Sequence, residues 1–312
     1  MRQYSCVLRI RKKGAERIVF RGNPIYKKEV RTGMRTARVA ALIVGFNTIL
    51  AIVAFVMFSN TIDGISNSGV LDYSGLADLY TVMAYIEFGI IAIVVPAITA
   101  GSVVGERERQ TLDVMLASKV RPFSIVWGKM LSCAQLIVTV CVSSLPVLSI
   151  VFVYGGIRIT NLLMLLFADI CIGCYFGSIG VFASCISKRT TTAVITAYVG
   201  MVAVIVLTGG IVYVGGAFNV MLLNPAATIV GLVGGQLEVE NFFEELLFYG
   251  IARNGKERME NWTVCSIAAQ LIFSTALLLI SAWILNPLKF GLWRRLKKLY
   301  GNRKNKKDVI SD

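Results

Sequence analysis

The sequence predicts an all-helical membrane protein with six transmembrane helices. Of its 312 residues, 56% are hydrophobic and 16% are charged, and its mean hydropathy is +0.70. A soluble domain could not bury so much apolar surface. Six apolar runs are each long enough to cross roughly 30 Å of hydrocarbon as a helix. These runs cover about residues 37–58, 80–104, 125–154, 161–186, 191–214 and 262–285.

The distribution of charge predicts that both chain ends lie in the cytosol. Residues 1–36 carry eleven Lys and Arg against two Glu, and residues 287–312 carry nine against two Asp. The segments 59–79 and 215–261 are acidic instead. Because Lys and Arg concentrate on the cytoplasmic side of membranes, the two acidic segments are expected outside. The transmembrane domain then spans residues 37–286, with a basic segment at each end.

A short basic stretch precedes the first span. Its sequence, NPIYKKEVRT, follows Gly22, and its apolar residues can face lipid while its Lys and Arg side chains reach phosphates. We expect an interfacial elbow helix here rather than a merely solvated basic tail. The residues that define it are Asn23, Pro24, Lys28, Glu29 and Arg31.

Two further segments have recognisable packing signals. The fourth span carries Gly173, Gly177 and Gly180, a spacing that allows neighbouring helices to approach closely. In the long external segment, Asn224–Pro225 predicts the start of one short helix, and the run VENFFEELLFYGIA predicts a second. We expect a small helical cap between spans five and six that lies on the outer leaflet.

The segment from Gly105 to Lys129 is charged and has a helical pattern, although it lies between two apolar spans. Leu112, Met115 and Leu116 fall on one face of a helix over residues 106–118, with polar residues on the other face. We call residues 105–129 the charged connector. Its position on the cytosolic side predicts a docking site for a separate protein. A membrane-surface helix without a partner is the alternative.

Glu87 and Asp169 are the only ionisable side chains well inside the predicted spans. A bare charge there costs about 2.5 to 3.5 kcal/mol on insertion scales, so such residues usually face a bundle interior or a wet pathway. Both could lie at a similar depth and line a shared external vestibule on a translocation path. The alternative is that each is protonated or hydrogen-bonded and has no transport role.

Several function classes are excluded by residues that the chain lacks. It contains no histidine, which rules out Ser-His and Cys-His catalysis and His-ligated metals. No GxxxxGK[ST] motif occurs, so the chain has no phosphate-binding P-loop of its own. We therefore predict no catalytic site and no metal site in this chain. Lipid headgroups explain the net charge of +14 more simply than nucleic acid does.

Two motifs resemble those of ABC-2-type exporter permeases. Residues 105–131 read GERERQTLDVMLASKVRPFSIVWGKML, similar to the ERExGTLExLLxSP-like run that precedes a GK in these proteins. Residues 22–32, GNPIYKKEVRT, are similar to their NPxxxKExR entry. The likeness covers essentially the whole chain. Two departures are Gln110, where glycine is usual, and Lys119, where proline often follows the serine.

The resemblance implies an ATP-driven exporter in the cytoplasmic membrane of a bacterium. Two permeases, identical or paralogous, would assemble with two cytosolic ATPase subunits, which would bind the ATP and Mg²⁺. The charged connector would provide the coupling helix that docks on the ATPase. The residues that match this helix are Glu106, Arg107, Glu108, Arg109, Thr111, Leu112, Met115 and Leu116.

Two rival functions come from other classes. The first is an ion- or proton-coupled carrier or channel that uses Glu87 and Asp169. Its transport would follow an ion gradient without ATP. The second is a membrane anchor or sensor that transports nothing.

Overall fold

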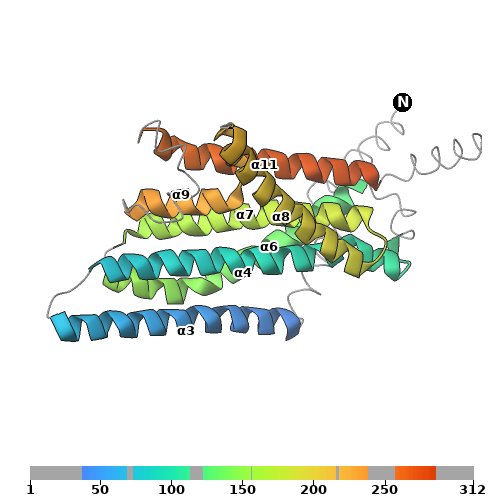
Figure 1. Cartoon of the computed structure of the whole chain (residues 1–312). Helices are drawn as coiled ribbons and strands as arrows, with labels where there is room; N and C mark the ends of the chain where they lie inside the picture. The colour runs from blue at the N-terminus through green and yellow to red at the C-terminus, as the bar shows by residue number, and fades with distance from the viewer. Residues whose placement is uncertain are drawn as a thin grey trace, which may run out of the picture.

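A computed structural model of the chain describes residues 37–68, 73–112, 122–155, 157–215, 218–237 and 257–285. Within these ranges the chain forms seven α-helices and one 3-10 helix, and no strand. Six of the helices are long and apolar enough to cross a membrane, which confirms the predicted fold class (Figure 1). These six are α3 (Ala37–Ser68), α4 (Tyr73–Glu108), α6 (Pro122–Gly155), α7 (Ile159–Ile186), α8 (Thr190–Gly215) and α11 (Glu257–Ile284).

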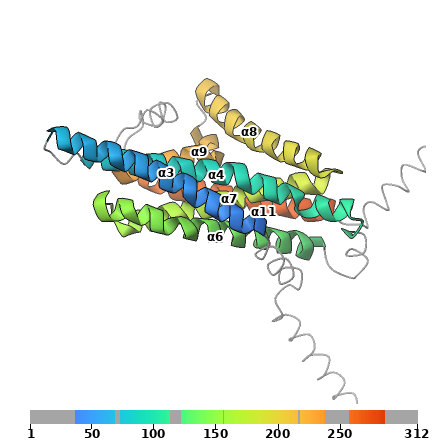
Figure 2. The ribbon, with the colours of Figure 1, turned by 90° about the horizontal axis from the view of Figure 1, so that it is seen from below.

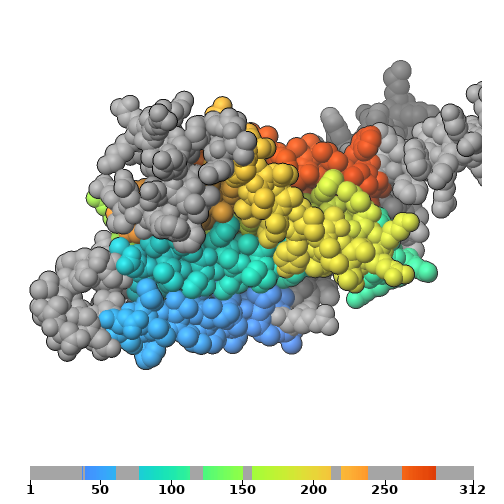
Figure 3. Space-filling model, in the orientation of Figure 1, coloured from blue at the N-terminus to red at the C-terminus, as the bar shows by residue number. Residues whose placement is uncertain are grey.

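Helix α7 is the centre of the bundle. It packs against α4, α6, α8 and α11, whereas α3 packs mainly against α4 and α6 at one edge. Figure 2 shows α8 running at an angle to the other long helices, and in the space-filling view α4 lies between α3 and α8 on one face (Figure 3). The most deeply buried helix therefore carries both Asp169 and the predicted glycine series.

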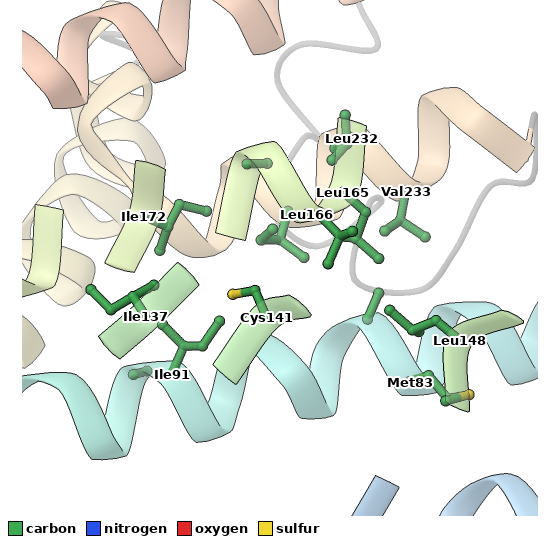
Figure 4. Packing of buried hydrophobic residues seen from close by; sticks show 14 of the residues in the cluster. Met83, Ile91, Ile137, Cys141, Leu148, Leu165, Leu166, Ile172, Leu232 and Val233 are labelled. Carbon is green, nitrogen blue, oxygen red and sulfur yellow. The ribbon is translucent and has the colours of Figure 1, made fainter. Parts of the chain in front are cut away.

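The largest core cluster joins α3, α4, α6, α7, α8 and α9, and Figure 4 shows part of it. Inside a membrane, helices associate mainly through van der Waals packing, because lipid tails are as apolar as the side chains themselves. Close interdigitation therefore decides where each helix lies. The buried contacts that Figure 4 labels are Met83 and Ile91 of α4, Ile137, Cys141 and Leu148 of α6, Leu165, Leu166 and Ile172 of α7, and Leu232 and Val233 of the short helix α9.

The glycine series of α7 lies where the neighbouring helices come closest. A Cβ atom on Gly173 would lie 2.8 Å from Ile137 of α6, and one on Gly177 would lie 3.2 Å from Met130 of the same helix. A Cβ atom on Gly180 would overlap the Thr99 side chain of α4. These contacts confirm that the small-residue spacing allows close helix approach.

The first external segment is shorter than predicted. Residues 59–79 are expected to be a loop, but α3 continues to Ser68 and α4 begins at Tyr73. The apolar part of α3 nevertheless ends at Asn60. A change from apolar to acidic composition marks where a helix leaves hydrocarbon, and it does not mark where the helix ends.

Between α8 and α11 the chain forms the 3-10 helix η1 (Phe218–Leu223) and α9 (Pro225–Leu237). The prediction that Asn224–Pro225 starts a helix is confirmed. The Asn224 Oδ1 accepts a hydrogen bond from the Ala226 amide at 3.1 Å, and Pro225 takes the first helical position, which needs no donor.

Helix α9, the first helix of the expected cap on the outer leaflet, packs into the bundle and does not rest on its surface. The second expected helix of the cap lies outside the described residues. Most residues of α9 are buried, and it contacts α4, α7 and α11. Tyr80 of α4 donates to Gln236 Oε1 at 2.6 Å, and the Gln236 amide donates to the Asn161 carbonyl of α7 at 3.1 Å. On the other side, Gln270 of α11 donates to Thr228 Oγ1 at 2.6 Å.

Candidate functional site

The charged connector begins inside α4. A coupling helix over residues 106–118 is expected to follow the second span, but α4 continues to Glu108, so that Glu106, Arg107 and Glu108 form its last turn. At this end of the bundle α4 and α7 end while α6 and α8 begin, and we call it the connector end. Each of the three charged side chains contacts a different neighbouring segment there.

Glu106 forms an ion pair with Lys129 of α6. The Lys129 Nζ lies 2.7 Å from the Glu106 Oε1, and the two side chains are only 5% and 18% exposed, respectively. A charge with so little access to water requires a partner, and removing one member of such a pair is strongly destabilising. This ion pair joins the end of α4 to the first turns of α6.

Arg107 reaches the end of α7. Its guanidinium donates to the carbonyl of Cys185 at 3.1 Å and to the carbonyl of Ser187. The last carbonyls of a helix have no partner within the helix and lie at the negative end of its dipole. A positively charged guanidinium, which can donate two hydrogen bonds at once, is therefore well suited to this position. It connects α4 to the end of α7.

Glu108 caps the start of α8. Its two carboxylate oxygens accept from the Thr190 backbone amide at 2.7 Å and from the Thr190 hydroxyl at 2.6 Å. The first amides of a helix lack acceptors within the helix and favour a negative charge. An acidic side chain from another helix thus performs the role of an N-cap for α8.

A tight turn follows Glu108. The amide of Thr111 donates to the Glu106 carbonyl at 3.0 Å, and the amide of Gln110 donates to the Arg107 carbonyl at 3.1 Å. Gln110 has a φ of 57°. This pattern is a Schellman motif with Gln110 at the left-handed C′ position, where glycine is usual. The turn therefore has the backbone form that a glycine would give, although glutamine occupies it.

Replacing Gln110 by glycine should stabilise the protein. Glycine adopts a positive φ without the steric cost that a Cβ atom imposes, so the free energy of unfolding should rise by about 1 kcal/mol. Gln110→Val should lower it, because a β-branched residue rarely adopts this conformation. Thermal unfolding in detergent measures both changes. A lower melting temperature for Gln110→Gly would contradict the left-handed turn.

The residues after the turn contact the bundle. Leu112 is 5% exposed and packs with Val103 of α4 and Ile125 of α6 in a cluster at the connector end. Its side chain faces the protein's own core, and not a partner. Arg109, by contrast, is exposed. Met115 and Leu116 lie outside the described residues, as do the elbow residues Asn23, Pro24, Lys28, Glu29 and Arg31.

The structure buries Glu87 and Asp169 completely. Both have an exposed fraction of 0%. Ser144 of α6 donates to the Glu87 Oε1 at 2.8 Å. The other Glu87 oxygen and both Asp169 oxygens have no hydrogen-bond partner among the described residues.

This burial is different from an open external vestibule. Instead the two carboxyl groups lie inside the packed interface of α4, α6 and α7, and the Ser144 hydrogen bond agrees with the alternative stated for Glu87. Within the described ranges, no group of three or more His, Cys, Asp or Glu residues is arranged to hold a metal ion.

Sequence reasoning did not find the partners of the charged turn. Lys129, Ser187 and Thr190 are separated from it by about 20 to 80 residues. Lys129 belongs to the quoted GK motif, and Ser187 and Thr190 border the short basic turn between spans four and five. No spacing rule connects such distant positions, so only the folded bundle reveals them.

The chain matches the sequence pattern of a transporter family. That family is described as "ABC-2 family transporter protein", and the match covers residues 23–298. No curated protein matches the chain closely enough to count as a relative. The matched range contains all six spans, the charged connector and the basic stretch that starts at Asn23. The predicted resemblance is thus confirmed, and the chain belongs to the ABC-2 family of transporters.

Proposed function

We propose that the chain is the permease subunit of an ATP-driven exporter. Two permeases, copies or paralogues, assemble with two cytosolic ATPase subunits in the cytoplasmic membrane. ATP and Mg²⁺ bind to the ATPase, because this chain has no P-loop of its own. Closure of the ATPase dimer moves the connector end of each permease and opens an outward path.

The observation that best supports this function is the construction of the connector end. The chain leaves α4 through a defined turn at Gln110, and the next residues pack back on the bundle through Leu112. A partner that binds beyond this turn is therefore in mechanical contact with the core. A surface loop without such contacts would absorb a displacement instead of passing it on.

The distribution of basic residues supports an orientation in which the connector end faces the cytosol. The basic ends of the chain and the basic turn at Lys188 and Arg189 would all lie on the side of the connector end. The stretch with Asn23, Pro24, Lys28, Glu29 and Arg31 would then form an elbow helix at the cytosolic headgroups. There it would lie beside the docked ATPase.

Reversing the charge of Arg109 should weaken ATPase binding without unfolding the permease. Arg109 is exposed at the connector end, so Arg109→Glu removes one attractive charge from the docking surface and adds a repulsive one. We expect at least a tenfold loss of affinity for the ATPase that co-purifies with the chain, measured by quantitative capture of the detergent-solubilised complex. The melting temperature of the permease should stay unchanged.

Arg158→Glu is the matched control for this experiment. Arg158 is also exposed, but it precedes α7 at the opposite end of the bundle. The same charge reversal there should leave ATPase binding intact. Equal losses for both variants would mean that net charge, and not the connector end, governs binding.

A further inference from the structure

We propose that Glu106, Arg107 and Glu108 form a clamp that makes the connector ends of α4, α6, α7 and α8 move as one body. The clamp depends on the proposed function only for the source of the force, which is the ATPase bound to the connector. The contacts of the three residues carry the rest of the inference.

Three successive residues on a helix point in directions about 100° apart. The last turn of α4 therefore spreads three charged side chains around its axis, and each one finds a different target. Glu106 pairs with Lys129 of α6, Arg107 binds the end of α7, and Glu108 binds Thr190 at the start of α8. One helical turn thus connects four of the six spans.

Each contact satisfies either a backbone group at a helix end or a buried charge. The Cys185 carbonyl and the Thr190 amide lie at helix ends, where partners within the helix are missing. Lys129 is buried enough to need a counter-ion. The Glu106 and Arg107 contacts are thus partly shielded from water, whereas the Glu108 contact is exposed and holds Thr190 through two hydrogen bonds.

The clamp lies between the turn at Gln110 and a tight helix contact. On its membrane side, Ser184 of α7 accepts hydrogen bonds from the Val103 and Val104 amides of α4 at 3.0 and 2.9 Å. On its other side, Gln110 turns the chain toward Leu112. A force applied beyond Gln110 thus reaches four helices together, and not α4 alone.

Paired spin labels test whether these helix ends move together. We would place them at the exposed Phe123 of α6 and at the exposed Lys188 between α7 and α8, with Cys6 and Cys265 replaced by Ser. The full chain is assembled with its ATPase, and labelled copies are diluted with unlabelled ones. The clamp predicts one narrow distance distribution that does not change when a non-hydrolysable ATP analogue is added.

Three conservative variants should broaden the distribution of distances between the two labels. Glu106→Gln, Arg107→Lys and Glu108→Gln keep the size of each side chain but remove the ion pair, the guanidinium fork and the capping charge, respectively. Each should broaden the distribution at least twofold. The exchanged pair Glu106→Lys with Lys129→Glu should restore part of the narrow distribution that Glu106→Lys alone loses.

Arg158→Gln is the matched control, because it neutralises an exposed arginine at the opposite end of α7 that neither the clamp nor the docking surface uses. It should keep the wild-type distribution. Wild-type widths in all three clamp variants, or a wild-type distance that changes with the ATP analogue, would overturn the clamp. Failure of the ATPase to bind would overturn the proposed function alone, since the broadening caused by the clamp variants is also measurable in the permease without nucleotide.

Discussion

Replacing Gly180 by valine is expected to stop the bundle from folding. A Cβ atom at this position would overlap the Thr99 Oγ1, lie 2.8 Å from the Thr99 Cβ and lie 3.3 Å from the backbone nitrogen of Ala100. Moving one rotamer cannot relieve these contacts, because two of the three atoms belong to or adjoin the backbone of α4. Helices α4 and α7 would have to separate along the central interface of the molecule.

A graded series makes this prediction quantitative. Gly180→Ala should lower the free energy of unfolding by about 1 to 3 kcal/mol, the usual cost of overpacking, and Gly180→Val should leave little folded protein. Monodisperse yield in detergent and the melting temperature measure both. Gly209→Ala on α8 is the control, because no atom lies within 4 Å of its added Cβ. It should be neutral or slightly stabilising.

A second substitution at Thr99 tests whether its side chain is what the methyl group added at Gly180 meets. Thr99→Gly removes both side-chain atoms that the new methyl group meets, so it should rescue part of the stability lost in Gly180→Ala. A double-mutant cycle measures that coupling. Normal folding of Gly180→Val, or no coupling between the two positions, would contradict the close approach of α4 and α7.

Neutralising Asp169 is expected to stabilise the protein. Its carboxyl group is fully buried, and neither oxygen has a hydrogen-bond partner among the described residues. Burying an unsatisfied polar group costs about 1 to 3 kcal/mol, and a charged one costs more. Asp169→Asn keeps the shape and removes the charge, so the free energy of unfolding should rise by about 1 kcal/mol or more.

Ser144→Ala should lower the free energy of unfolding, whereas Asp169→Asn should raise it. The Ser144→Ala change removes the hydroxyl that donates to the Glu87 Oε1 at 2.8 Å, and leaving that carboxyl without a donor should cost about 1 to 3 kcal/mol. Thermal unfolding of both variants under one set of conditions gives the comparison. A marked loss of stability in Asp169→Asn would mean that the carboxyl group has a partner, such as a bound cation. That result would favour the carrier hypothesis.

The number of spans was predictable because composition alone controls it. A helix that crosses hydrocarbon must hide its backbone polar groups, so each crossing needs about 20 apolar residues in sequence. The end of α3 at Ser68 was not predictable in this way, because a helix can continue into water. The position of α9 also escaped prediction. The acidic residues elsewhere in residues 215–261 place the whole segment outside by the charge rule. The run PAATIVGLVGGQL, however, is itself apolar enough to indicate burial.

Part of the candidate site was visible in the sequence and part was not. The charged turn at Glu106 to Glu108 was identified from its motif, and Gln110 was recognised as a departure at a glycine position. The structure explains that departure as a left-handed C′ residue. The contacts with Lys129, Ser187 and Thr190 depend on how distant helices meet, and one sequence carries no periodicity that specifies such pairs.

The central claim is that a separate ATPase drives this chain, and purification from the native membrane tests it most directly. The full-length protein would be isolated in mild detergent with its neighbours, analysed for bound subunits, and then reconstituted in vesicles. The proposed function predicts that an ATPase with a P-loop motif co-purifies and that transport requires ATP. A chain that carries no ATPase, and whose flux follows a proton gradient in the absence of ATP, would contradict it.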